Sequence, residues 1–215
     1  MSIPFYYFVG IVCWPTRLLY RLRATGRENL PAEGGFVLAS NHLSALDPWA
    51  LGYPLWPRRR LRWMAKIELF QRRWMKAMLD AGGAFPVRRG ESDQQAIAKG
   101  IEVLRAGDVL VMFPEGTRRR VGRARPRAHS GAARLALAAH APLVPAALAG
   151  TDRLGRLERW RVAYGRPVAT DDLGDLDRKN AADVATERLM AEIAKLETII
   201  AGETGFPNDP PSLDG

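Results

Sequence analysis

The stretch FVLASNHLSALDP, residues 36–48, places an apolar run directly before a histidine and an aspartate. Residues 36–40 predict a buried strand, because a short continuous apolar run is typical of a strand covered on both faces. Two interpretations of His42 and Asp47 are open. In the first, Asp47 caps a helix that begins at Pro48, and His42 is an ordinary polar residue at a strand end. In the second, His42 is a base and Asp47 orients its ring.

Strands and helices alternate on both sides of this stretch. Apolar runs predict strands, and amphipathic segments between them predict helices. This alternation favours an α/β fold. Besides 36–40, the expected strands are 60–65, 84–87, 109–113, 143–149 and 160–164, and the expected helices are 48–53, 67–81, 92–106, 131–140 and 181–200.

The spacing of His42 and Asp47 requires a turn between them. Five residues on a regular helix rotate by roughly 140°, so helical geometry would not bring the carboxylate to the ring. If a turn does so, Asp47 fixes the imidazole tautomer and His42 offers its other nitrogen as a base. A covalent mechanism lacks support, because the chain has no G-x-S-x-G elbow and its lone cysteine, Cys13, lies in the apolar N-terminus. The three histidines lack zinc-site spacing, so we expect no metal.

A second motif, FPEGTR at residues 113–118, comes at the end of the expected strand 109–113. Ligands of α/β sheets bind beyond the carboxyl ends of the strands, so we expect His42 and Glu115 to share one cleft. Glu115 either orients Arg118 or binds a substrate hydroxyl. The alternative is an ordinary polar turn.

Phosphate binding is the chemistry that we expect of this motif. Free backbone N–H groups around Gly116, together with Thr117 and Arg118, suit a phosphate. Arg88 ends the expected strand 84–87 and is placed to reach the same phosphate. The alternative for Arg88 is a solvated arginine.

Positive charge is concentrated in residues 1–170, which hold 28 Lys/Arg against 12 Asp/Glu, whereas residues 171–215 hold 4 against 11. A positively charged region of this kind attracts phosphate esters, anionic lipid or nucleic acid. Six arginines lie in residues 117–127, a density that is typical of nucleic-acid binding.

The N-terminal run IPFYYFVGIVCW, residues 3–14, is too short to span a bilayer, which needs about 20 apolar residues. Aromatic residues followed by arginines suit the headgroup region of a membrane; the alternative is a helix packed on the core. An anionic lipid surface explains this run and the arginine-rich loop with one partner, so we expect a membrane and no nucleic acid. We expect a peripheral or monotopic protein on the cytoplasmic face, with an interfacial segment 1–23, a domain 24–202 and a disordered tail 203–215.

Four sequence blocks occur in order along the chain. They are N-H-x-x-x-x-D at Asn41, His42 and Asp47, G-x-x-F-x-x-R at Gly82, Phe85 and Arg88, F-P-E-G-T-R at 113–118, and a proline block at Val144 and Pro145. The set resembles the glycerophospholipid acyltransferases, specifically the lysophosphatidic acid acyltransferases, over roughly residues 24–200. The resemblance implies a single-domain α/β fold with a mixed, mostly parallel sheet flanked by helices.

The resemblance also implies a reaction. His42 would take the proton from the free hydroxyl of 1-acyl-glycerol-3-phosphate, and that oxygen would attack the thioester of acyl-CoA or acyl-carrier protein to give phosphatidic acid. A thiolate, whose conjugate acid has a pKa near ~8.5, leaves readily, so one base suffices and no cofactor is needed besides the acyl donor. Arg88 and residues 115–118 would bind the glycerol phosphate.

One position departs from the family pattern. Members often carry a lysine just before the helix expected at 131–140, where this chain has Arg127 and His129. Acceptor identity therefore stays open, and another lyso-lipid or an amino-lipid is the alternative within the same chemistry. A non-catalytic protein that binds anionic lipid or nucleic acid is the alternative from a different class.

Overall fold

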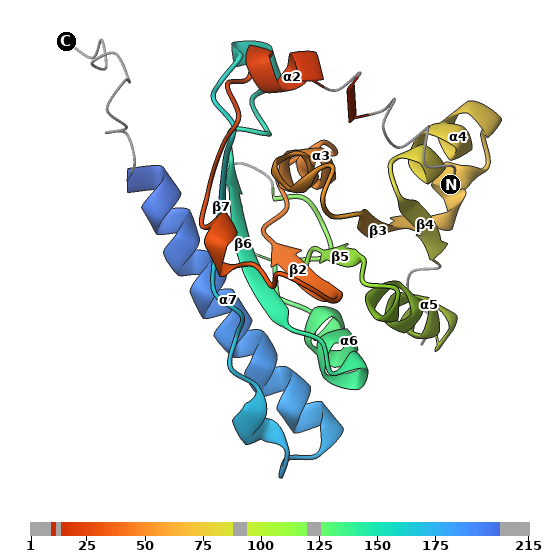
Figure 1. The fold of residues 1–215 in the computed structure, drawn as a ribbon, viewed down its shortest axis with the longest axis vertical. Coiled ribbons are helices and arrows are strands. Elements are labelled where there is room, and N and C mark those ends of the chain that lie inside the picture. The colour runs from red at the N-terminus through yellow and green to blue at the C-terminus, as the bar shows by residue number, and fades with distance from the viewer. Residues whose placement is uncertain (1–9, 12–13, 88–93, 120–125, 203–215) are drawn as a thin grey trace.

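One seven-stranded sheet organises the computed structural model, which describes residues 10–11, 14–87, 94–119 and 126–202 (Figure 1). The strand order is β1-β7-β6-β2-β5-β3-β4, and every neighbouring pair is parallel except β6 with β7. The expected α/β class with a mixed, mostly parallel sheet is confirmed. The strands are β1 (Arg23–Thr25), β2 (Phe36–Ser40), β3 (Leu61–Lys66), β4 (Ala84–Val87), β5 (Val109–Met112), β6 (Leu143–Ala149) and β7 (Arg161–Tyr164).

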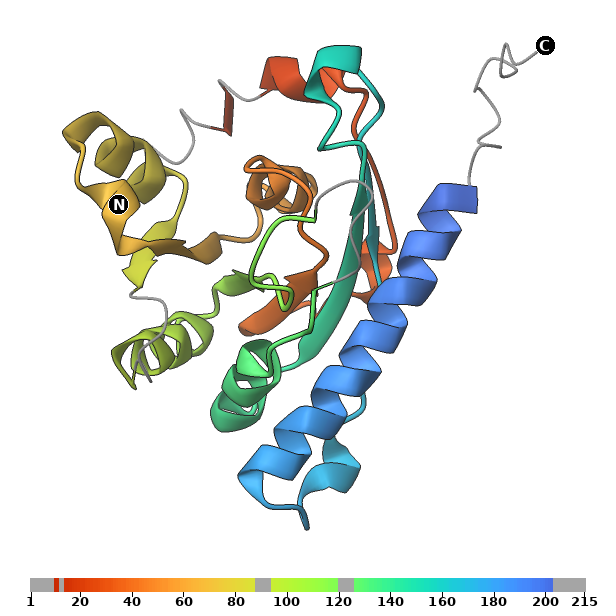
Figure 2. The ribbon, with the colours of Figure 1, turned by 180° about the vertical axis from the view of Figure 1, so that it is seen from behind.

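Helices cover both faces of the sheet (Figure 1 and Figure 2). Residues of α5, α6 and α7 pack on one face, and α3 packs on the other. The α-helices are α2 (Trp14–Leu19), α3 (Asp47–Gly52), α4 (Arg73–Ala81), α5 (Gln94–Arg105), α6 (Gly131–Ala139) and α7 (Arg178–Gly202). Short 3-10 helices are η1 (Arg27–Asn29), η2 (Tyr53–Leu55), η3 (Ile67–Phe70), η4 (Leu154–Arg156) and η5 (Asp171–Leu173).

Strand β2 lies in the middle of the sheet and is buried along its whole length. Val37 and Ala39 belong to the apolar cluster with α5, α6 and α7, whereas Phe36 and Leu38 belong to the cluster with α3. Successive side chains of a strand point to opposite faces, so a strand covered on both faces needs an unbroken apolar run. The run FVLAS therefore specifies an interior strand.

Three strands deliver their following loops to one edge of the sheet. Ala39 of β2 lies beside Met112 of β5, and Ser40 lies beside Ala146 of β6, in parallel register. The chain segments that begin at residues 41, 113 and 150 therefore leave the sheet at the same edge. In open α/β sheets this carboxyl edge is where ligands bind.

Among the differences from the expected elements, two concern residues 67–81 and 23–25. The helix expected over 67–81 is divided into η3 and α4, because Arg72 has an extended backbone (φ −88°, ψ 124°). Strand β1 is not among the expected strands, since it has three residues and no apolar run. Its pairing with β7 at the sheet edge creates it, and the Arg23 N–H donates to Trp160 O at 2.9 Å. This strand crosses the expected boundary between residues 23 and 24.

Several expectations fall outside the described residues. They concern Arg88, the start of the helix expected at residue 92, the middle of the arginine-rich loop at 120–125, and the tail 203–215. Most of the N-terminal run, residues 1–9 and 12–13, lies outside them as well.

Candidate active site

His42 and Asp47 form a hydrogen-bonded pair directly after β2. The Nδ1 of His42 lies 2.8 Å from Oδ2 of Asp47. The Asp47 side chain is fully buried, whereas 14% of the His42 side chain is exposed. Because a carboxylate can only accept, the Nδ1–H of the ring donates, and Nε2 keeps its lone pair. The pair therefore presents a nitrogen that can accept a proton.

A tight turn brings the two side chains together across five positions. The backbone N–H groups of Leu43 and Ser44 donate to the same Oδ2 of Asp47, at 2.6 and 2.9 Å. The carboxylate of Asp47 thus contacts the residues that precede it and not the N–H groups of α3. The N-cap residue of α3 is Leu46, which makes no side-chain capping hydrogen bond. The interpretation of Asp47 as a helix cap is wrong, and the turn required by the spacing is present.

Thr151 completes the surroundings of the carboxylate. Its hydroxyl donates to Oδ1 of Asp47 at 2.6 Å, and the residue is fully buried. Sequence reasoning missed this residue, which lies 104 positions from Asp47. The available signal was its place two residues beyond β6, at the same sheet edge as His42.

Asn41 ties the end of β2 to β6. Its Oδ1 accepts from the Leu148 N–H at 2.8 Å, and its Nδ2 donates to Leu148 O at 2.9 Å. The Ser40 hydroxyl also donates to Asn41 Oδ1, at 3.0 Å. The Asn41 side-chain amide therefore bonds to the backbone of Leu148 beyond the last paired residues of β2 and β6. These bonds fix the backbone next to His42.

Phe113, the first residue of the FPEGTR motif, packs against His42. The Phe113 ring stacks on the imidazole with centroids 4.0 Å apart and an interplanar angle of 16°. The Arg119 N–H donates to the carbonyl of His42 at 2.8 Å. Stacking and hydrogen bonding therefore hold the ring and its backbone from the side of this motif.

Glu115 is fully buried and pairs with Arg119 rather than with Arg118, which corrects the expected orientation of Arg118. The Nε of Arg119 donates to both carboxylate oxygens of Glu115, at 2.8 and 2.9 Å. Arg119 also pairs with Glu197 of α7 at 2.7 Å. Burial lowers the pKa of Arg119, but the hydrogen bonds that it donates to Glu115 and the charge of Glu197 outweigh burial and raise that pKa above its ordinary value. Sequence reasoning missed Arg119, one of six arginines in the loop.

The turn itself uses backbone N–H groups that were expected to be free for a phosphate. The Gly116 N–H donates to Phe113 O at 2.9 Å, and the Thr117 N–H donates to Glu115 O at 2.7 Å. Gly116 has a φ of 66°, a conformation that favours glycine. Thr117 and Arg118 are exposed beyond this turn. An anion at this place would therefore meet their side chains.

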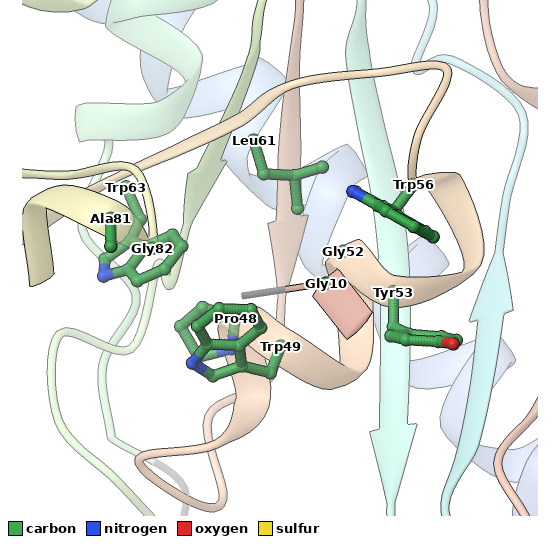
Figure 3. A pocket seen from close by; sticks show the side chains of 10 residues that line it. All are labelled: Gly10, Pro48, Trp49, Gly52, Tyr53, Trp56, Leu61, Trp63, Ala81 and Gly82. Atoms are coloured by element: carbon green, nitrogen blue, oxygen red, sulfur yellow. The ribbon is translucent and has the colours of Figure 1, made fainter. Parts of the chain in front are cut away.

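An apolar pocket begins one residue after Asp47 (Figure 3). Pro48, Trp49 and Gly52 of α3 line it, and Trp63 of β3 and Gly82 lie beside Trp49. The Trp49 and Trp63 rings meet edge to face, with centroids 6.1 Å apart. A Cβ at Gly82 would lie 2.7 Å from the Trp63 ring, so glycine is needed for this close approach.

Comparison with known proteins gives consistent results. Residues 21–149 match the model of the acyltransferase family. A relative from Bacillus subtilis, named 1-acyl-sn-glycerol-3-phosphate acyltransferase, is 34% identical over 179 residues, which are 82% of this chain and 88% of that protein. A relative of the same name from Streptococcus pneumoniae is 30% identical over 77% of this chain and 61% of its own length.

A solved structure has the same fold. It is the 1-acyl-sn-glycerophosphate acyltransferase from Thermotoga maritima, with a TM-score of 0.60 and 22% identity over 89% of this chain and 80% of that one. The resemblance carried by the four sequence blocks is thus confirmed. The family model, which spans more than half of the residues, and the Bacillus relative together show that this chain belongs to the acyltransferase family.

Proposed function

We propose that this acyltransferase moves a fatty acyl group from a thioester to the free hydroxyl of 1-acyl-glycerol-3-phosphate, with His42 as the base. The observation that carries the proposal is the 2.8 Å contact between His42 Nδ1 and Asp47 Oδ2. The names of the relatives from Bacillus subtilis and Streptococcus pneumoniae support the same acceptor and product. Acyl-CoA and acyl-carrier protein are the candidate donors.

The reaction needs one proton acceptor. His42 Nε2 takes the proton of the acceptor hydroxyl while the oxygen attacks the thioester carbonyl carbon. The new C–O bond forms, the C–S bond breaks, and the thiolate leaves with the electron pair. Because a thiol has a pKa near ~8.5, the thiolate leaves without a separate acid and later takes the proton from His42 or from water. Asp47 faces the imidazolium and stabilises its charge.

The acceptor phosphate lies, in this proposal, against the exposed Thr117 and Arg118 beyond the Gly116 turn, with Arg88 as a further ligand. Glu115 acts on this site through Arg119, since its carboxylate is buried against that guanidinium. The acyl chain lies in the apolar pocket that starts at Pro48, beside the base.

Arg118→Ala is expected to raise the Michaelis constant for the phosphorylated acceptor by roughly tenfold, since a hydrogen bond to a charged group contributes about 1.5–3 kcal/mol. The Michaelis constant for the acyl donor should change much less. Steady-state kinetics with each substrate varied in turn checks this. Arg134→Ala, an exposed arginine on α6, is the matched control. Equal effects on both substrates would contradict a phosphate role for Arg118.

Thr151→Val is expected to lower kcat by about tenfold, because the hydroxyl that steadies Asp47 is removed from a buried site. Thr151 is a positioning residue, so the Michaelis constants should stay near those of the native protein. Thr151→Ser keeps the hydroxyl and should recover most of the rate. If serine and valine behave alike, the hydrogen bond to Asp47 is unimportant for turnover.

The N-terminal helix supports association with a membrane. Trp14, Leu18 and Leu19 of α2 are more than half exposed. Aromatic and aliphatic side chains of this kind, followed by arginines, suit the interface of a bilayer. In the part of the chain that the structure describes, none of the helices combines the length and apolarity needed to cross a bilayer. The exposed side chains of α2 support a peripheral position at a membrane, and the cytoplasmic face is part of the same proposal.

Release of free thiol from acyl-CoA, with and without 1-acyl-glycerol-3-phosphate, tests the proposed function. We expect release that depends on the acceptor and a product that is phosphatidic acid. Release with another lyso-lipid or an amino-lipid, but not with this acceptor, would move the assignment to that acceptor. If neither acyl-CoA nor acyl-carrier protein donors react with any of these acceptors, the proposed reaction is wrong.

A further inference from the structure

The segment formed by η3 and α4 exposes large apolar side chains. The exposed fractions are 37% for Ile67, 43% for Leu69, 61% for Trp74 and 53% for Met78. Of the nine residues of α4, Ala81 is the one that is buried. We call Ile67, Leu69, Trp74 and Met78 the α4 face. These four side chains are exposed, although large apolar side chains usually pack in the core.

The α4 face has a basic rim. Trp74 and Met78 are four residues apart, so they lie on the same side of the helix. Lys66, Arg72 and Arg73 flank this side in the sequence and are exposed. Lys76 is exposed as well and pairs with Asp80 at 2.5 Å. Large apolar side chains beside lysine and arginine match the chemistry of an anionic bilayer surface.

The position of α4 connects this face to the apolar pocket. Its last residue, Ala81, and the following Gly82 line the pocket beside Trp49 (Figure 3). The segment η3 follows the carboxyl end of β3, which runs parallel to β5, so it leaves the sheet at the edge where His42 lies. The last residue of this short helix thus lines the pocket, whereas Trp74 and Met78 of the same helix are exposed.

We propose that the α4 face inserts into the interface of an anionic bilayer, as a second contact besides the N-terminal helix. Trp74 and Met78 enter the region between headgroups and acyl chains, and the basic rim contacts lipid phosphates. An acyl chain can then pass between the bilayer and the pocket without crossing water. The role of this contact in lipid transfer rests on the proposed function, whereas the insertion itself does not.

A fluorescent label tests the insertion directly. In a Cys13→Ser background, Met78→Cys carries an environment-sensitive nitrobenzoxadiazole label, and Ala191→Cys on the exposed side of α7 is the control. Vesicles of phosphatidylcholine with phosphatidylglycerol should shift the emission at position 78 to the blue, and lipid-borne doxyl quenchers should reduce it. The label at position 191 should not respond. No response at position 78 would overturn the proposal and leave the face to a protein partner.

Activity separates docking from catalysis. Trp74→Glu with Met78→Glu should lower turnover of a long-chain acceptor in anionic vesicles by roughly tenfold or more, since each 1.4 kcal/mol of lost binding is tenfold. Turnover of a short-chain acceptor dispersed as monomers should stay near native. Ile199→Glu, at an exposed apolar residue of α7, is the matched control. Equal losses with both acceptors would overturn a docking role. A protein that turns over no acceptor would refute the proposed function, yet the label would still report insertion.

Discussion

Replacing His42 by alanine is expected to lower acyl transfer by ~10²- to 10⁴-fold, the range that a general base typically contributes. The variant loses the nitrogen that accepts the hydroxyl proton in the proposed reaction. It also loses the stacking of Phe113 on the imidazole, whereas the apolar pocket and the Glu115–Arg119 pair keep their contacts. The amount of protein that sediments with anionic vesicles should therefore stay close to native. Thiol release from acyl-CoA in the presence of acceptor is the measurement.

A second histidine serves as the control for this variant. His140 is exposed, ends α6 and has a φ of 51°. His140→Asn suits that conformation, because asparagine tolerates positive φ better than most residues. We expect His140→Asn to retain native activity. Acyl transfer that survives in His42→Ala would show that His42 is not the base.

Removing the charge of Arg119 is expected to lower the free energy of unfolding by about 3 kcal/mol, because breaking a buried ion pair leaves a charge without its partner. The Glu115 side chain is fully buried, and 27% of the Arg119 side chain is exposed. We would measure Arg119→Met by urea denaturation. The decrease in the free energy of unfolding should be several times larger than the decrease caused by breaking an exposed ion pair.

Two further variants test whether the loss of stability in Arg119→Met comes from the unpaired charge of Glu115. Arg188→Met breaks the exposed pair with Asp172 and should cost much less stability than Arg119→Met. Combining Arg119→Met with Glu115→Gln removes both charges and should recover a large part of the lost stability. If the double variant is no more stable than Arg119→Met, the loss arises from packing and not from the buried carboxylate.

The His42–Asp47 pair was one of two open interpretations, because a spacing of five residues closes the pair only if a turn lies between them. The resemblance carried by the four sequence blocks, and not the spacing, favoured the pair. Thr151 was not predictable in the same way, since the sheet register between β2 and β6 brings it to Asp47. Arg119 was hidden among neighbouring arginines, and only the path of the turn decides which one reaches Glu115.

The fold was predictable where burial of a strand on both faces requires a continuous run of apolar residues in the sequence. Interior strands such as β2 and β6 need unbroken apolar runs, and these runs were visible. Strand β1 has no such run, because an edge strand of three residues is held by its backbone bonds to β7. The division between η3 and α4 was also invisible, since residues 71 and 72 are compatible with a helix and the extended backbone of Arg72 interrupts it.

The carboxylate of Asp47 receives four hydrogen bonds from the protein: from the His42 ring, from two backbone N–H groups and from Thr151. The fold thus sets the dipoles around the ring before any proton moves. In water, a newly formed imidazolium would have to reorient its solvent, and that reorganisation adds to the barrier. If His42 takes the proton as proposed, the groups that hold Asp47 are already in place when the chain folds, so less reorientation is needed to stabilise the imidazolium.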